Sequence, residues 1–115
     1  MANPTSESSG TQTATVTTEH TLDDIAAAGL YQLVVDLGNM VAGDVVELRA
    51  YQAVLASGTL RQLAFHAFYG AQAVGIPAVS PWLSNVNTDA ASLRFTLKQT
   101  FGTGRDFAWQ VYKAT

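Results

Sequence analysis

The chain has 115 residues, of which 48% are hydrophobic and only 13% are charged, with a formal net charge of −3 and no cysteine. The absence of cysteine excludes disulfides, thiolate metal sites and cysteine nucleophiles, and no apolar run approaches the roughly 20 residues that span a bilayer. Soluble domains usually carry about 25% charged residues, so the low charge favours a surface partly covered by partners over a monomer with a Ser/Thr/Gln-rich surface. The length fits one domain with a single modest core.

Acidic and basic residues are unevenly distributed along the chain. Residues 1–48 hold seven acids and no Lys or Arg, whereas residues 49–115 hold six bases and two acids, so the two parts carry −7 and +4. Either the two parts neutralise each other inside one domain, or the asymmetry helps identical copies to meet head to tail. We favour the first interpretation.

The first nineteen residues are rich in small and polar side chains. Residues 1–10 are small and polar, which predicts a flexible N-terminal arm or one ordered only against a neighbour. They lack the basic and apolar regions of a secretory signal. Residues 11–19 are Thr-rich and predict the first strand. Residues 20–29 fit a short helical turn that Gly29 would end, or a plain loop.

Alternation of apolar and polar residues between turn signals predicts the remaining strands. They cover residues 30–37, 44–55, 59–69, 91–101 and 106–113, with a short strand around residues 73–79. The inward-facing residues are predicted to be Tyr31, Leu33, Val35, Leu37, Val46, Leu48, Ala50, Val54, Leu63, Phe65, Ala67, Leu93, Phe95, Leu97, Phe107, Trp109 and Val111. This pattern predicts an all-β fold, an antiparallel β-sandwich over residues 11–115, with a jelly roll as one topology and a small barrel as the alternative.

No combination of residues indicates catalysis. The only histidines are His20 and His66, no G-x-S-x-G elbow is present, and His66 lies inside an apolar strand, as packed structural histidines do. His20 with Asp23 and Asp24 is the only cluster of metal-ligand types, and it lacks zinc or EF-hand spacing. Adjacent carboxylates in one loop also cannot flank a glycosidic bond. We therefore predict no catalytic residue, no metal and no cofactor.

Basic and aromatic residues supply the candidates for an interface. Arg94 and Lys98 share one strand face, and Arg105 follows in a glycine-rich segment that is better explained as a hairpin turn than as a phosphate loop. A net charge of −3 argues against nucleic-acid binding. Trp82 follows Pro81 in an irregular segment, where an aromatic side chain often anchors an interface. The predicted interface residues are Asn3, Pro4, Pro81, Trp82, Arg94, Lys98 and Arg105.

Two stretches carry a resemblance to a known group of proteins. Residues 33–49 contain LVVDLGNM followed by AGDVVELR, and residues 96–105 contain TLKQT followed by GTGR. This pattern resembles small virion structural proteins of tailed bacteriophages, capsid decoration proteins among them, and covers most of residues 14–113. The resemblance implies a structural protein without catalytic residues.

The expected function is therefore that of a decoration or cement protein on the surface of the virion, made in the host cytoplasm. Its expected partners are the major capsid protein or other virion proteins, and further copies of itself in a homo-oligomer, most simply a trimer. Nucleic acid and membranes are not expected partners. The alternatives are a tail, neck or head-fibre component and, from another class, a carbohydrate-binding β-sandwich module.

Overall fold

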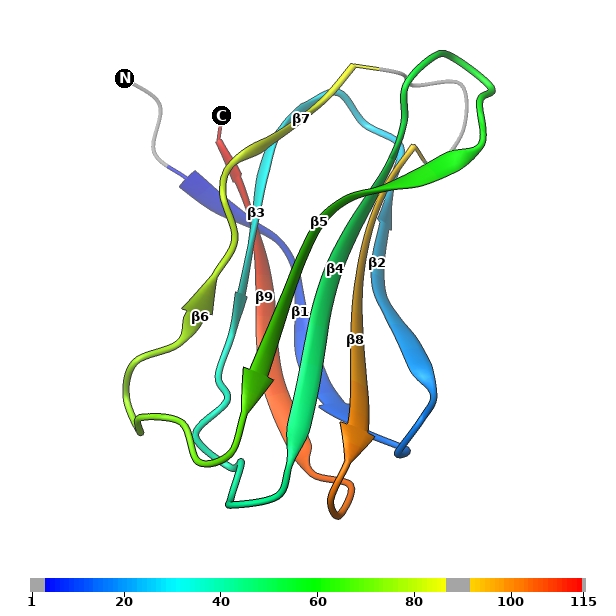
Figure 1. Cartoon of the computed structure of the whole chain (residues 1–115). Helices are drawn as coiled ribbons and strands as arrows, with labels where there is room; N and C mark the ends of the chain where they lie inside the picture. Colours follow the sequence, from blue (N-terminus) through cyan, green and yellow to red (C-terminus); the bar gives the residue numbers. More distant parts are fainter. Residues whose placement is uncertain (1–3, 87–91, 115) are drawn as a thin grey trace.

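The computed structural model describes residues 4–86 and 92–114, and two antiparallel sheets lie face to face in it (Figure 1). The strands are β1 (Pro4–Thr13), β2 (Glu19–Ile25), β3 (Gly29–Val35), β4 (Val45–Ala53), β5 (Leu60–Tyr69), β6 (Ala78–Val79), β7 (Leu83–Asn85), β8 (Leu93–Phe101) and β9 (Asp106–Ala114). The predicted all-β antiparallel sandwich is confirmed. Among the described residues, no helix is long and apolar enough to cross a membrane.

The order of the strands is that of a jelly roll. The first sheet has the order β1-β9-β3-β6, with the short β7 also paired to β3, and the second sheet has the order β2-β8-β4-β5. The chain crosses between the sheets at each step from β1 to β4, stays in the second sheet for the β4–β5 hairpin, and then crosses again toward β9. Two interleaved Greek keys of this kind define the jelly-roll architecture.

The core lies between the inner faces of the two sheets. Its fully buried side chains include Tyr31, Leu37, Val35, Val46, Leu93, Phe95, Leu97, Phe107 and Val111, and Trp109 packs against this cluster while partly buried. Alternation predicted all of these as inward-facing. Their burial supplies the main favourable free energy of folding, because apolar surface removed from water contributes about 25 cal/mol per Å².

The flexible arm predicted for residues 1–10 is wrong for residues 4–10. These residues belong to β1, which pairs with β9 along its whole length, from Pro4 opposite Ala114 to Thr13 opposite Asp106, with a β-bulge at Glu7. Most β1 side chains are exposed, so backbone hydrogen bonds to β9 hold this strand rather than apolar burial. The strand also ends at Thr13, short of the expected residue 19.

Residues 19–25 form β2 instead of a helical turn or loop. The pairing of β2 with β8 contains a β-bulge between Thr21 and Asp23. The bulge lets Leu22 and Ile25, three residues apart, both point into the core. A spacing of three between buried residues is typical of helices, which is why the segment does not show the alternation of a strand.

The facing of β5 differs from the prediction. Ala64 and Phe68 pack against the core, while Leu63 and Phe65 are exposed, because Phe68 lies opposite the buried Val46. Leu63 is the extra residue of a β-bulge in the pairing with β4. The segment is apolar on both faces, so alternation could not identify its inner side. Val54, also predicted to face inward, lies beyond the end of β4 and is exposed.

Candidate interaction surfaces

Ion pairs join the acidic and the basic parts of the chain. Among the described residues, the pairs are Arg49 with Glu19 and Glu47, Arg94 with Asp24, and Arg105 with Asp44. Each pair links an acid from residues 1–48 to a base from residues 49–115. This arrangement agrees with the interpretation that the two parts neutralise each other within one domain.

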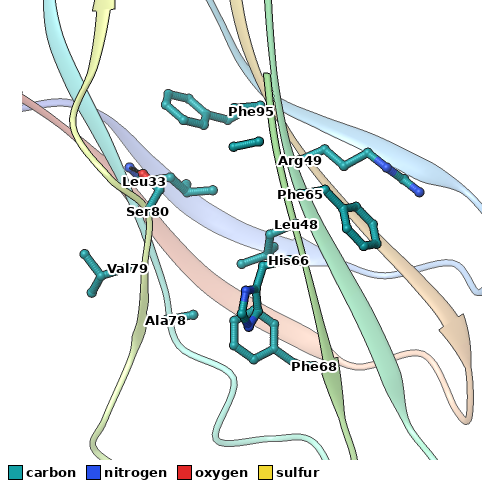
Figure 2. Close-up of a pocket in the computed structure, with 12 residues that line it drawn as sticks. Leu33, Leu48, Arg49, Phe65, His66, Phe68, Ala78, Val79, Ser80 and Phe95 are labelled. Atoms are coloured by element: carbon teal, nitrogen blue, oxygen red, sulfur yellow. Dashed lines mark hydrogen bonds between the residues drawn. The ribbon is translucent and has the colours of Figure 1, made fainter. Parts of the chain in front are cut away.

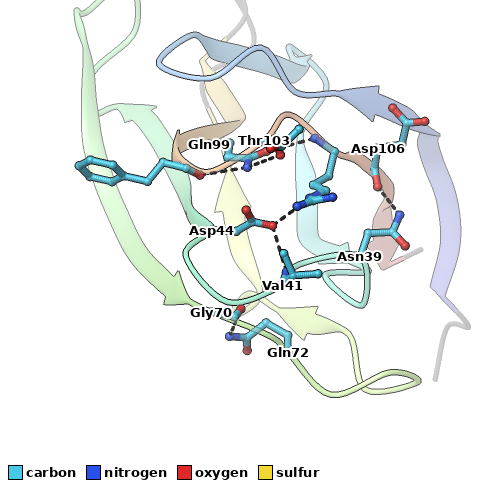
Figure 3. Close-up of polar contacts among 10 residues, drawn as sticks. Asn39, Val41, Asp44, Gly70, Gln72, Gln99, Thr103 and Asp106 are labelled. Carbon is cyan, nitrogen blue, oxygen red and sulfur yellow. Dashed lines mark hydrogen bonds and ion pairs between the residues drawn. The ribbon is translucent and has the colours of Figure 1, made fainter.

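Asp44 organises the end of the sandwich where β4 begins and β8 ends (Figure 3). Its buried carboxylate accepts hydrogen bonds from the Val41 backbone N–H at 3.0 Å and from Arg105 Nε at 3.0 Å. Burial acts to raise the pKa of Asp44, but the hydrogen bonds from Val41 and Arg105 and the guanidinium charge hold that pKa below its ordinary value. Arg105, predicted as an interface residue, is therefore directed into the protein.

Gln99 completes this polar end. Its Nε2 donates to the carbonyl oxygens of Phe101 and Thr103 at 3.0 and 2.8 Å, and its Oε1 accepts the Arg105 backbone N–H at 3.2 Å. The side chain is fully buried, and these contacts satisfy its polar atoms. Asp44, Gln99 and Arg105, which we call the polar end, thereby pin the turn before β4 to the turn after β8. Residues 102–105 turn the chain as predicted, but the predicted hairpin is wrong, because β8 and β9 lie in different sheets and do not pair.

The outer face of the second sheet carries a second polar network. Glu19 accepts hydrogen bonds from the Tyr51 hydroxyl at 2.6 Å and from Thr96 Oγ1 at 2.7 Å. Partial burial acts to raise the pKa of Glu19, but these two hydrogen bonds and the charge of Arg49 hold that pKa below its ordinary value. Thr96 faces outward, as predicted, yet it is buried beneath this network.

The predicted basic patch is not assembled as one surface. Arg94 bonds Asp24 at 2.6 Å, and Lys98 lies opposite Glu19 and Glu47 on the neighbouring strands. Arg105 points into the polar end instead. The bases on this face are therefore interleaved with acids, which favours a role in holding the second sheet together.

The histidines and the remaining acid of the metal-like cluster make structural contacts. His20 Nε2 accepts the Thr15 backbone N–H at 3.0 Å, and Asp23 accepts a hydrogen bond from Ser8 Oγ at 2.6 Å. The interpretation of His66 as a packed histidine is wrong, because His66 is exposed on the edge strand β5, with its ring 4.5 Å from that of Phe68. Across residues 4–86 and 92–114, no group of three or more His, Cys, Asp or Glu side chains could hold a metal ion.

The opposite end of the sandwich and the edge next to it expose large apolar side chains, which we call the apolar end. Val54, Leu55 and Val86 lie on loops at the end itself, and Trp82 lies beside the middle of β3, just before Leu83, which pairs with Tyr31. These side chains are between 40% and 79% exposed. A hydrogen bond from the Gln52 side chain to the Ser84 carbonyl holds the end of β4 beside β7, so the loops that follow and flank these strands share this end. Trp82 and its neighbour Pro81 are both exposed in the segment between β6 and β7, a position that an interface requires.

The two long edges of the sandwich also differ. At one edge, the hydrogen bond from Ser8 to Asp23 links β1 to β2 across the sheets. At the other edge, a cavity of about 260 Å³ opens between β5 and β6, with Leu48, Phe68 and Ala78 among its apolar lining residues (Figure 2). Phe65 and Arg49 also border this cavity, and the Arg49 guanidinium lies 5.0 Å from the centre of the Phe65 ring. In the sequence, this open edge is indicated by apolar residues on both faces of residues 59–69.

No family model, no curated protein and no solved structure matches this chain. Residues 33–49 and 96–105, which carry the resemblance to small virion proteins, lie close together in the fold. Those two stretches meet at the polar end, where Asp44 of the first binds Arg105 of the second. This ion pair therefore serves the fold.

Proposed function

We propose that this chain is a structural subunit of a tailed-bacteriophage virion, a decoration or cement protein that binds the capsid shell through the apolar end and has no enzymatic role. The observation that carries the proposal is the exposure of Val54, Leu55 and Val86 on loops at one end of the sandwich, with Trp82 exposed on the edge next to it. Exposed apolar clusters mark interaction sites, because water makes them costly to leave uncovered.

The chemistry of the polar residues supports a structural role. The buried carboxylate of Asp44 and the amide of Gln99 are saturated by hydrogen bonds within the chain, and Glu19 is held by Tyr51, Thr96 and Arg49. An enzyme needs polar groups that are free to engage a substrate. Jelly rolls occur in capsid proteins and in lectins, so the fold alone does not choose between these functions.

A cement protein acts by contacting several shell subunits at once. Separating the subunits would then expose the apolar end to water, which raises the free energy of the dissociated particle. Trp82 is the expected anchor, because buried aromatic side chains dominate the energetics of many interfaces. A tail, neck or head-fibre position would use the same surface against a different virion protein.

Co-sedimentation with capsids that lack this protein tests the proposal. Wild-type protein should bind and raise the temperature at which the capsids rupture, and Val54→Ser and Trp82→Ala should weaken binding. Val74→Ser is the matched control, since Val74 is a valine of similar exposure, 85% against 79% for Val54, in the segment between β5 and β6. Binding to glycans with no binding to any particle would contradict the proposal and support a carbohydrate-binding module.

A further inference from the structure

The edge strand β5 is unusually open to pairing. It is the last strand of the second sheet, and its straight part, residues 64–69 (AFHAFY), holds no Lys, Arg, Asp, Glu or Pro. Natural edge strands are normally protected against pairing by charge, proline or short length. The other edge of the same sheet follows that rule, because β2 carries Glu19, Asp23 and Asp24.

The side chains of this segment have the same character when read in either direction from Ala67. Phe65 and His66 precede Ala67, and Phe68 and Tyr69 follow it. In an antiparallel pair centred on Ala67, Phe65 would lie opposite the partner's Tyr69, and His66 opposite the partner's Phe68. Each pair would form twice. Aromatic cross-strand pairs of this kind stabilise sheets.

The facing of these side chains fits that register. Phe65 and Tyr69 lie on the outer face, where they are 46% and 71% exposed, whereas Phe68 packs inward and His66 lines the cavity. A two-fold axis perpendicular to the sheet places the outer face of one copy beside the outer face of the other. Phe65 can then lie opposite the partner's Tyr69 on the outer face, and His66 opposite the partner's Phe68 on the inner face. A register centred on His66 would instead place Phe65 opposite an alanine and lose these aromatic pairs.

We propose that β5 pairs antiparallel with β5 of a second copy of this chain, with the two-fold axis at Ala67, so that the second sheets of the two copies join into one continuous sheet. The β-bulge at Leu63 ends the paired segment on one side, since it bends the strand there. The same contact brings the partner next to the open cavity between β5 and β6. A two-fold contact gives a dimer rather than the trimer expected from composition.

Sedimentation equilibrium of the free protein tests this inference independently of attachment to particles. Wild-type protein should be a dimer, and Ala67→Lys should raise the dissociation constant at least about tenfold, because it sets two like charges against each other at the axis. The variant should still fold, since Ala67 lies opposite Glu47 on β4 and a lysine there would face an opposite charge. Ser9→Lys, on the exposed surface of the edge strand β1, is the matched control and should leave the dimer intact.

Cysteine cross-linking tests the register. The chain has no cysteine, so Ala67→Cys introduces a single thiol, and residues directly opposite in an antiparallel pair are close enough for a disulfide. With oxidised glutathione as the oxidant, Ala67→Cys should form a covalent dimer much faster than Ser9→Cys does. A wild-type monomer at high concentration, a trimer unaffected by Ala67→Lys, or equal cross-linking of the two cysteine variants would overturn the inference.

Discussion

The two ends of the sandwich hold their inter-strand turns in different ways. At the polar end, Asp44, Gln99 and Arg105 bind the turns to one another through buried hydrogen bonds. At the apolar end, Val54, Leu55 and Val86 are exposed on loops. Val41 and Phe101 are exposed at the polar end as well, so what marks the polar end is its buried hydrogen-bond network, which we expect to be a source of stability.

Among substitutions at the two ends of the sandwich, removal of the Asp44 carboxylate should have the largest effect on stability. We expect Asp44→Ala to lower the free energy of unfolding by about 2–3 kcal/mol, because it leaves Arg105 and the Val41 N–H without their acceptor. The loss should be smaller than for a fully buried pair, since Arg105 keeps some contact with water. Urea unfolding followed by tryptophan fluorescence measures it, and a loss below about 0.5 kcal/mol would show that the polar end is not a source of stability.

A methyl group at Gly102 should disturb the same end by crowding. Gly102 has φ +94°, and a Cβ there would collide with Asp44 Oδ1. We expect Gly102→Ala to cost about 2 kcal/mol, since it adds a steric conflict to the backbone strain. Gly43→Ala is the matched control, because Gly43 has φ +92° but open space around its Cβ position, and it should cost about 1 kcal/mol. Equal losses in the two variants would mean that only the backbone conformation matters.

Acid should weaken the protein through the same carboxylate. The pKa of Asp44 is depressed in the folded state, so its stabilising contribution is present above its unfolded pKa of about 4 and is lost as the pH falls through the lower folded value. Glu19, whose pKa is also depressed, adds to this loss. When the melting temperature is measured from pH 7 to pH 3, it should therefore decrease once the pH is below about 4. In Asp44→Asn, the melting temperature should depend less on pH over this range. An unchanged slope in that variant would assign the acid sensitivity to other groups.

Trp82→Ala should have the smallest effect on the free protein. Its side chain is 40% exposed and lies outside the core cluster, so we expect the free energy of unfolding to fall by about 1 kcal/mol or less. Trp109→Ala serves as the comparison and should cost about 3 kcal/mol, because that ring packs against the core. Similar losses from both substitutions would show that the apolar end is part of the core rather than a surface.

Alternation predicted the parts of the fold where one strand face is buried and the other polar, as in β8 and β9. It failed where bulges changed the spacing, as between Leu22 and Ile25, and where both faces were apolar, as at Phe65. It also missed the first residues of β1, since a strand held by backbone pairing leaves no apolar signature. The contact of Asp44 with Arg105 joins residues 61 positions apart, and no local pattern encodes it.

Among the predicted interface residues, exposure agrees with the expectation for Pro81 and Trp82, because an aromatic side chain next to proline in an irregular segment seldom reaches the core. Pro4 lies at the start of β1, and Asn3 lies outside the described residues. For Lys98 and Arg94, the sequence alone could not predict which acidic side chains would lie beside them. Their position on a strand face was predictable, but the acids that lie opposite them come from strands far away in the chain.

The position of β8 and β9 has a consequence for synthesis on the ribosome. These last two strands occupy inner positions, β8 between β2 and β4 and β9 between β1 and β3. Until residues 93–114 leave the exit tunnel, β1 and β2 lack the neighbours that hold them in the finished sheets. Neither sheet can therefore be completed before β8 and β9 have been synthesised. We expect both sheets to form late, with the unpaired early strands a target for chaperones until then.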